Sequence, residues 1–133
     1  MGDDPYDADP AYAGQVRGSE HAEHYGWVEN APGLMRHIDV LVAPSRSEPF
    51  GTVLSEAMAV GTPVVSTNVD GLPEVVTDGV NGALVAPGDV DALASAVLRV
   101  LAGRDAMGEA ARKSAQRFGA DAYADRVEEL LVG

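Results

Sequence analysis

Short apolar runs, each bounded by turn residues, divide the middle of the chain into recurring segments. Residues 39–43 and 63–67 are rich in valine, a pattern that predicts two buried parallel strands. Residues 44–51 have the composition of a loop. Residues 52–60 have the length of a helix, and Gly61 gives that helix a normal end. The middle of the chain is therefore predicted to fold as strand, loop, helix and strand.

The same patterns continue on both sides of this unit. Residues 83–85 predict a further strand, and a weaker apolar run at residues 22–28 predicts another. Helical spacing of apolar residues predicts helices at about residues 90–102, 105–116 and 121–132. The chain is thus expected to be an α/β protein with about four short parallel strands and flanking helices.

Residues 1–20 differ from the rest of the chain because they carry several aspartates and no sustained apolar period. They are expected to form a poorly structured acidic lead-in. Residues 21–133 are expected to form one small domain.

Two glutamates flank the predicted start of the central helix. The loop before this helix follows a strand at the edge where open α/β sheets bind ligands, and the helix offers unpaired N–H groups from Gly51, Thr52 and Val53. These donors and the helix dipole favour a phosphate group. Glu48 precedes the helix and Glu56 lies about one turn inside it, roughly 5.4 Å further along the axis. A ligand that touches both glutamates is elongated, with its anionic part between them, as in a nucleotide-sugar. The alternative is that both are solvated surface acids.

The residues around these glutamates form a longer set of motifs. The set consists of Pro44-Ser45, Glu48, Phe50-Gly51, Glu56-Ala57-Met58, Gly61-Thr62-Pro63-Val64-Val65, Gly71-Leu72-Pro73-Glu74-Val75-Val76, Asp78-Gly79, Asn81-Gly82 and Pro87-Gly88-Asp89. Together they resemble the donor-binding signature of retaining glycosyltransferases with the two-domain GT-B fold. The resemblance is strongest to glycosyltransferase family 4 (glycosyl transferases group 1) and covers about residues 26–131.

The resemblance implies roles for single residues at the sugar. The residue matching Glu48 holds hydroxyls of the transferred sugar, and the backbone amides matching Phe50, Gly51 and Thr52 contact sugar hydroxyls. It also implies that neither a metal nor another cofactor is required.

The resemblance also implies roles for residues that bind the nucleotide part of the donor. The amide matching Val53 faces the diphosphate, Glu56 binds the ribose hydroxyls, and Trp27 and Val28 lie near the base. Arg46 could approach a phosphate from the loop, and the alternative is that it is a solvated loop cation. The sequence does not show whether the donor is UDP-linked or GDP-linked, which sugar is transferred, or which acceptor receives it.

The chain also departs from the family pattern. A complete enzyme has an amino-terminal acceptor domain, and its donor domain begins with a strand that leads into a Gly/Arg loop and a lysine. The one lysine here is Lys113, near the carboxyl end. If the doubly wound order 3-2-1-4-5-6 holds, the chain is a Rossmann-like half of GT-B that lacks its first two strands. The exposed sheet edge that results, near Val40, invites self-association.

Two classes of function therefore stay open. In the first, the chain is the donor-binding portion of a glycosyltransferase that transfers a hexose with retention, truncated and inactive without an acceptor domain or partner chain. In the second, it is a non-catalytic nucleotide-sugar-binding module or a gene remnant. Because the sequence is compatible with both classes, it does not decide whether the chain by itself is an enzyme.

The amino-acid composition limits the kinds of partner that the chain is expected to bind. With 21 acidic and nine basic residues the formal net charge is −12, which argues against nucleic acid or an anionic membrane surface as a partner. No apolar run approaches the roughly 20 residues that span a bilayer, so a cytoplasmic protein is expected. The spacing of the three histidines does not match a metal-binding motif, and the chain has no cysteine; the histidines are His21, His24 and His37.

The high density of negative charge also suggests a salt-adapted protein. Mutual repulsion of the acidic groups should weaken the fold, and molar salt shortens the screening length to about 3 Å. We expect the free energy of unfolding, measured by urea denaturation, to rise with salt concentration. A stability independent of salt would contradict this hypothesis.

Overall fold

The computed structural model describes residues 18–23, 29–47 and 52–116. The chain divides into two compact units, Met1–Ala31 and Pro32–Gly133. In the described part of the first unit, residues 18–23 and 29–30 form turns and coil, and the His21 N–H donates to the Ser19 hydroxyl at 3.2 Å. Most of the strand predicted at residues 22–28 lies outside the described residues.

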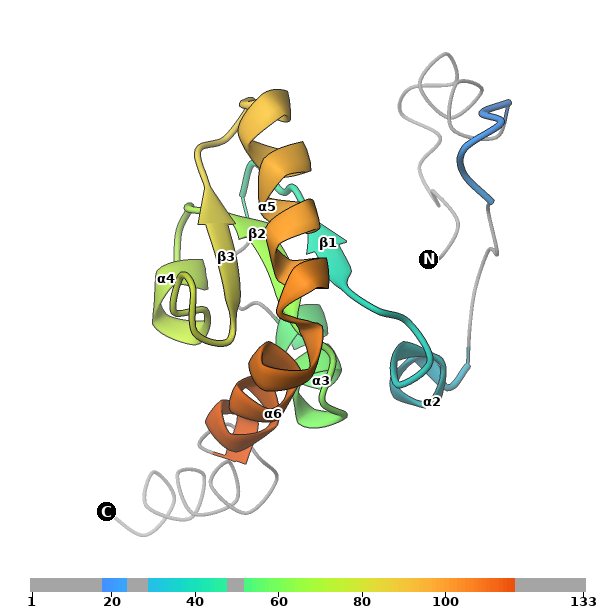
Figure 1. Cartoon of the computed structure of the whole chain (residues 1–133), viewed down its shortest axis with the longest axis vertical. Helices are drawn as coiled ribbons and strands as arrows, with labels where there is room; N and C mark the ends of the chain where they lie inside the picture. The colour runs from blue at the N-terminus through green and yellow to red at the C-terminus, as the bar shows by residue number, and fades with distance from the viewer. Residues whose placement is uncertain (1–17, 24–28, 48–51, 117–133) are drawn as a thin grey trace, which may run out of the picture. The chain divides into compact units, whose positions relative to one another are not determined.

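A three-stranded parallel sheet forms the centre of the second unit (Figure 1). Its strands are β1 (Leu41–Ala43), β2 (Val64–Thr67) and β3 (Gly82–Val85), and they lie in this order across the sheet. The parallel α/β class and the three strands predicted in this region are confirmed. The chain returns to the same end of the sheet before each strand, so all three strands end at one edge.

Helices connect and cover the strands. They are α2 (Ala31–Met35), α3 (Thr52–Ala59), α4 (Leu72–Val75), α5 (Val90–Ala102) and α6 (Arg104–Ala115). The predicted helices at residues 52–60, 90–102 and 105–116 correspond closely to α3, α5 and α6. The helix predicted at residues 121–132 lies outside the described residues.

The boundaries of α5 have clear chemical causes. The Asp89 carboxylate accepts a hydrogen bond from the Ala92 N–H at 2.9 Å, which satisfies one of the free donors of the first turn. At the other end, Gly103 closes α5, and its own N–H donates to the carbonyl groups of Arg99 and Val100. The next helix starts directly after this glycine, at Arg104.

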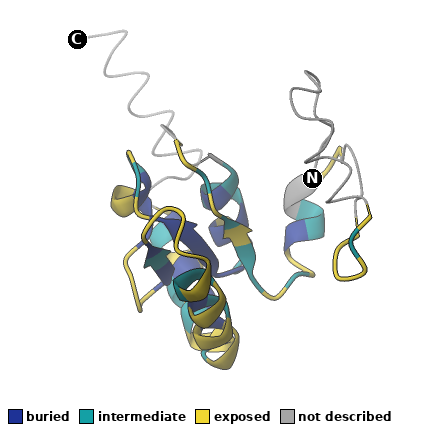
Figure 2. Cartoon of the chain, turned by 90° about the horizontal axis from the view of Figure 1, so that it is seen from above, coloured by how far each residue is buried: buried dark blue, intermediate teal, exposed yellow. Residues whose placement is uncertain are grey.

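The core lies on both faces of β2, because every residue of this strand is buried and successive side chains point to opposite faces. On one face, Ala96 and Val100 of α5 pack with Val65, Ala83 and Val85. Helix α3 also contacts β2 and buries Leu54, Ala57 and Met58 completely. The sheet is therefore sandwiched between helices at its centre (Figure 2).

Candidate functional site

The end of β1 and the start of the loop that follows it are fastened to the carboxyl end of β2 by two hydroxyl groups. The Ser66 hydroxyl donates to the Ala43 carbonyl at 3.2 Å, and the Thr67 hydroxyl donates to the carbonyl of Ser45. Both hydroxyls belong to buried residues at the end of a buried strand. The start of the loop is thereby held at the sheet edge where all three strands end, and this edge is where open α/β sheets bind ligands.

Helix α3 begins at this edge and brings several of the predicted site residues together. Thr52 and Val53 are its first two residues, and Glu56 is half-buried one turn later. Glu56 lies four positions after Thr52, which corresponds to a rise of about 6 Å along the helix axis. Arg46 lies exposed in the loop that precedes the helix. The predicted geometry of a helix start with an internal carboxylate is thus present.

Five of the predicted site residues lie outside the described residues. They are Trp27, Val28, Glu48, Phe50 and Gly51.

A second loop, which follows β2, reaches the same edge. The Asn68 N–H donates to the Val85 carbonyl at 2.8 Å, and two residues later Asp70 adopts a left-handed conformation with φ of 48°. This conformation is uncommon for a residue with a side chain and marks a constrained turn into α4. The sequence motif Asp-Gly at this position indicates a turn, but it does not reveal that the turn lies at the edge where β1 and β3 also end.

Comparison with known proteins identifies the family. The sequence profile described as "Glycosyl transferases group 1" matches residues 1–103. The chain belongs to the glycosyl transferases group 1 family. The resemblance seen in the motifs is therefore confirmed, and the matched region extends to residue 1.

Curated relatives of this glycosyl transferases group 1 chain include a glycogen synthase and a D-inositol 3-phosphate glycosyltransferase. It is 46% identical over 88 residues to a glycogen synthase of Mycobacterium tuberculosis, a match that covers 66% of the chain and 21% of the relative. It is 45% identical over 107 residues to a D-inositol 3-phosphate glycosyltransferase of Streptomyces griseus, covering 78% and 23% respectively. The chain thus spans about a fifth of the length of these relatives.

Solved structures share its fold. The sucrose-phosphate synthase of Thermosynechococcus elongatus superposes with a TM-score of 0.86 and 33% identity, over 98% of this chain and 36% of that chain. The Anabaena protein HepE in complex with UDP-glucose superposes with a TM-score of 0.80 and 30% identity, over 86% and 33% respectively. The fold of the glycosyl transferases group 1 chain therefore matches part of the Rossmann-like half of GT-B enzymes.

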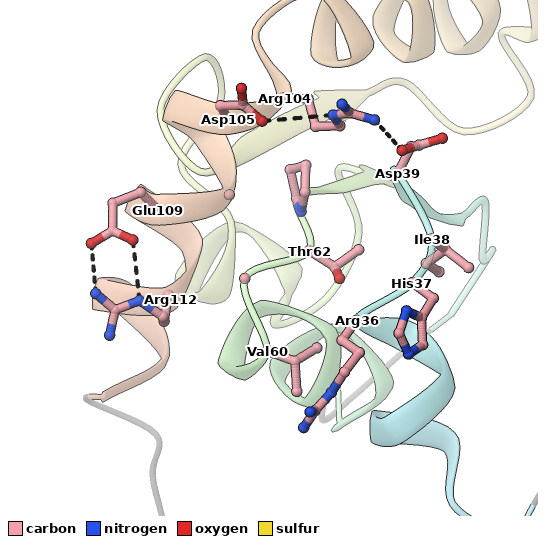
Figure 3. Close-up of a pocket in the computed structure, with 13 residues that line it drawn as sticks. Arg36, His37, Ile38, Asp39, Val60, Thr62, Arg104, Asp105, Glu109 and Arg112 are labelled. Carbon is pink, nitrogen blue, oxygen red and sulfur yellow. Dashed lines mark hydrogen bonds and ion pairs between the residues drawn. The ribbon is translucent and has the colours of Figure 1, made fainter.

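A pocket of about 500 Å³ lies at the opposite end of the sheet (Figure 3). Its walls are residues 36–39 ahead of β1, residues 60–63 ahead of β2, and part of α6. Arg104 pairs with Asp39 and Asp105, and Arg112 pairs with Glu109. None of the predicted site residues lines this pocket, so it is separate from the predicted donor site.

The ion pair between Glu109 and Arg112 in this pocket shifts the titration of Glu109 in a way that can be measured. The hydrogen bonds from Arg112 lower the pKa of Glu109, and the positive charges of Arg112 and Lys113 act in the same direction. A lowered pKa means that the pair stabilises the fold above the ordinary glutamate pKa, and that this contribution disappears as the pH falls through the lowered value. Both groups are exposed, so the effect on stability is small.

We expect Arg112→Gln to return the pKa of Glu109 toward its ordinary range, whereas Lys113→Gln leaves most of the lowering in place. The Glu109 side-chain carboxyl resonance, followed by NMR as a function of pH, measures both variants. Equal Glu109 titrations in the two variants would show that the hydrogen bonds to Arg112 are not the main cause.

Neither metal binding nor membrane insertion is indicated by the described residues. Among them, no group of three histidine, cysteine, aspartate or glutamate side chains could hold a metal ion. Within the same residues, no helix has both the length and the apolar character needed to cross a bilayer.

Proposed function

We propose that the chain is the donor-binding portion of a retaining glycosyltransferase that transfers a hexose from a nucleotide-diphosphate sugar, and that it is incomplete and inactive alone. The observation that carries this proposal is the start of α3 at the carboxyl end of β1, with Glu56 one turn inside the helix. Family membership supports the reaction class.

The chemistry of this helix start fits a diphosphate. The first N–H groups of a helix have no partner within it, and the dipole adds roughly half a positive charge at this end. The amides of Thr52 and Val53 are therefore proposed as donors to the sugar and to the diphosphate, respectively. Arg46, exposed on the preceding loop, is proposed as a cation that approaches a phosphate.

We propose that two carboxylates bind the two ends of the nucleotide-sugar donor. Glu56 is proposed to accept hydrogen bonds from the ribose hydroxyls, and Glu48 to accept them from the transferred sugar. The amides of Phe50 and Gly51 are proposed to contact the same sugar, with Trp27 and Val28 near the base. HepE, which is 30% identical, was solved with UDP-glucose, and this favours a uridine nucleotide over a guanosine one.

Replacing Glu56 with alanine tests the ribose contact. Loss of hydrogen bonds to a charged acceptor is expected to weaken UDP-glucose binding by about 1–3 kcal/mol, which is a roughly 5- to 150-fold rise in the Kd. Isothermal titration calorimetry with millimolar UDP-glucose measures this change. Glu109→Ala is the matched control, because Glu109 is a helix carboxylate at the opposite end of the sheet and should leave the Kd unchanged. An unchanged Kd for Glu56→Ala would remove this residue from the site.

The alternative function, a non-catalytic nucleotide-sugar-binding module or a gene remnant, makes a different prediction. An incomplete donor domain should bind more tightly when it is joined to further polypeptide of the family, and that longer protein should transfer the sugar. A repurposed module should bind equally well alone. A remnant should bind in neither form.

A further inference from the structure

Helix α6 packs directly on α3, the helix whose start forms the proposed donor site (Figure 1). The buried residues of α6 are all small; they are Gly108, Ala111 and Ala115. At 100° per residue these three positions share one face of the helix. A face without large side chains allows the backbone of α6 to come close to its neighbours.

The backbones of the two segments meet at Gly108 of α6 and Gly61, which lies just beyond the end of α3. A Cβ added to Gly108 would overlap the carbonyl oxygen of Gly61, and it would lie 3.6 Å from Cδ of Pro63. A Cβ added to Gly61 would instead meet its nearest atom, the Gly108 carbonyl oxygen, at an ordinary 3.8 Å. The contact therefore leaves no space for a side chain at position 108, whereas position 61 has space for one.

This contact accounts for the presence of a glycine inside α6. A glycine in the interior of a helix makes that helix less stable than an alanine would. Gly108 is the fifth of the twelve residues of α6, and its backbone does not have the positive φ that favours glycine. The close approach to Gly61 is the feature of the structure that requires it.

The carbonyl group of Gly61 is held in place from both sides. The Gly61 N–H donates to the Met58 carbonyl at 3.0 Å, which joins this residue to the last turn of α3. The next residue, Thr62, is buried and donates its N–H to the Ala57 carbonyl at 3.0 Å. The Thr62 hydroxyl donates to the Met35 carbonyl at 2.7 Å. A group that displaces the Gly61 carbonyl is therefore expected to displace the end of α3 with it.

Helix α6 is anchored as well. Its start follows the end of α5 after a single residue. Near its other end, the Ser114 hydroxyl accepts a hydrogen bond from the side-chain amide of Asn81 at 3.1 Å. Asn81 is buried and is bonded in turn to the Thr77 N–H and the Val75 carbonyl. These contacts oppose a retreat of α6, so a methyl group on Gly108 is expected to push against α3.

The loop that precedes α3 is held by contacts that do not involve α6. The Ser66 and Thr67 hydroxyls fasten the carbonyl groups of Ala43 and Ser45 to β2. A movement of α3 therefore changes the position of its first N–H groups relative to this loop. A good hydrogen bond of about 2.9 Å is lost at about 3.6 Å, so a shift of less than about 1 Å is enough to weaken binding.

We propose that Gly108 is a positioning residue for donor binding, although it lines the pocket at the end of the sheet opposite the proposed site. Because it lets the backbone of α6 reach the Gly61 carbonyl, it sets the position of α3 and thereby of the Thr52 and Val53 amides. This inference rests on the proposed function.

Isothermal titration calorimetry with millimolar UDP-glucose measures the effect on binding, at a temperature where every variant is folded by circular dichroism. We expect Gly108→Ala to raise the Kd about 10-fold or more, as for the loss of one hydrogen bond to a charged group. Gly61→Ala is the matched control on the other side of the same contact. Its Cβ has space, but the φ of 83° strains an alanine, so the Tm should fall by about 5 °C while the Kd stays unchanged.

A second control, Val100→Ala, separates positioning from a general loss of stability. Val100 is fully buried in α5 and packs with the core residues of β2 and β3, so its truncation leaves a cavity there. We expect a lower Tm and an unchanged Kd. If all three variants raise the Kd equally, or if Gly108→Ala leaves it unchanged, the proposal is overturned.

The amide resonances of the nucleotide-free protein test the positioning without any donor. Gly108→Ala is expected to shift the NMR signals of the Thr52 and Val53 amides at the far end of α3, whereas Gly61→Ala and Val100→Ala leave them in place. Unmoved Thr52 and Val53 signals in Gly108→Ala would overturn the proposal. If the original protein does not bind UDP-glucose, the proposed function fails, and these signals still decide the role of Gly108.

A further variant replaces Gly108→Ala in both measurements if that variant does not fold. Ala111→Val adds volume to the same face of α6 one turn later, at a fully buried position. Shifted Thr52 and Val53 amides in this variant support the close packing of α6 as the feature that positions α3. Unshifted amides in a folded Ala111→Val protein overturn the proposal.

Discussion

Replacing Gly82 with alanine is expected to destabilise the protein by about 3 kcal/mol, because the added methyl group overpacks the sheet. A Cβ at this position would overlap the carbonyl oxygen of Val64 on the neighbouring strand. That oxygen belongs to the backbone of a strand in which every residue is buried, so it cannot move without shifting the centre of the core. The close approach of β2 and β3 therefore depends on glycine at this position.

Urea unfolding followed by circular dichroism measures this change. Gly103→Ala is the matched control, since a Cβ there meets its nearest atom, in the Met107 side chain, at 3.8 Å. The control is expected to stay within about 0.5 kcal/mol of the original protein. Equal stabilities for the two variants would show that β2 and β3 do not approach each other as described.

Replacing Leu54 with alanine is expected to cost about 2–5 kcal/mol of stability, because it leaves a cavity in a fully buried site. Leu54 lies in the first half of α3 and helps to anchor the helix whose start forms the proposed donor site. The Leu54→Ala substitution should therefore destabilise the fold and hold the start of α3 less firmly in place.

The same urea measurement tests this second prediction against a leucine-to-alanine control on the surface. Leu98→Ala in the isolated chain is expected to change the free energy of unfolding by less than about 0.5 kcal/mol, because Leu98 is 69% exposed. A small loss for Leu54→Ala, similar to that of the control, would contradict the burial of α3 against the sheet.

The strands and the longer helices could be predicted because their sequence patterns are local. The valine-rich runs that became β1 and β2 are each bounded by turn residues, and α5 has both an N-cap aspartate and a terminal glycine. The helices α2 and α4 were not predicted, since five and four residues are too few to show an apolar period.

The exact side of α5 that faces the core was harder to predict. The sequence pattern favours a stripe of Leu93, Val97 and Leu101. In the structure the fully buried residues are Ala96 and Val100, and Leu101 is partly exposed. Small alanine side chains allow the helix to lie close to the sheet, and a pattern that counts large apolar residues misses this contact. The shift leaves Leu98 69% exposed and Leu101 39% exposed.

Part of the candidate site could be predicted because the residues that form it are close together in the sequence. A loop, a helix start and a glutamate one turn later are neighbours in sequence, and their arrangement follows from helix geometry. The anchoring of the loop was not predictable, because the hydrogen bond between Thr67 and Ser45 joins segments 22 residues apart. Only the pairing of β1 with β2 brings these groups together.

NMR titration of the amide resonances with UDP-glucose tests whether a nucleotide-diphosphate sugar binds at the start of α3. We expect the Thr52 and Val53 amides to shift with increasing ligand up to millimolar concentration, while the amide of Gly108, in the pocket at the other end of the sheet, stays unchanged. Shifts confined to that pocket, with Thr52 and Val53 unaffected, would show that the nucleotide-sugar does not bind at the start of α3.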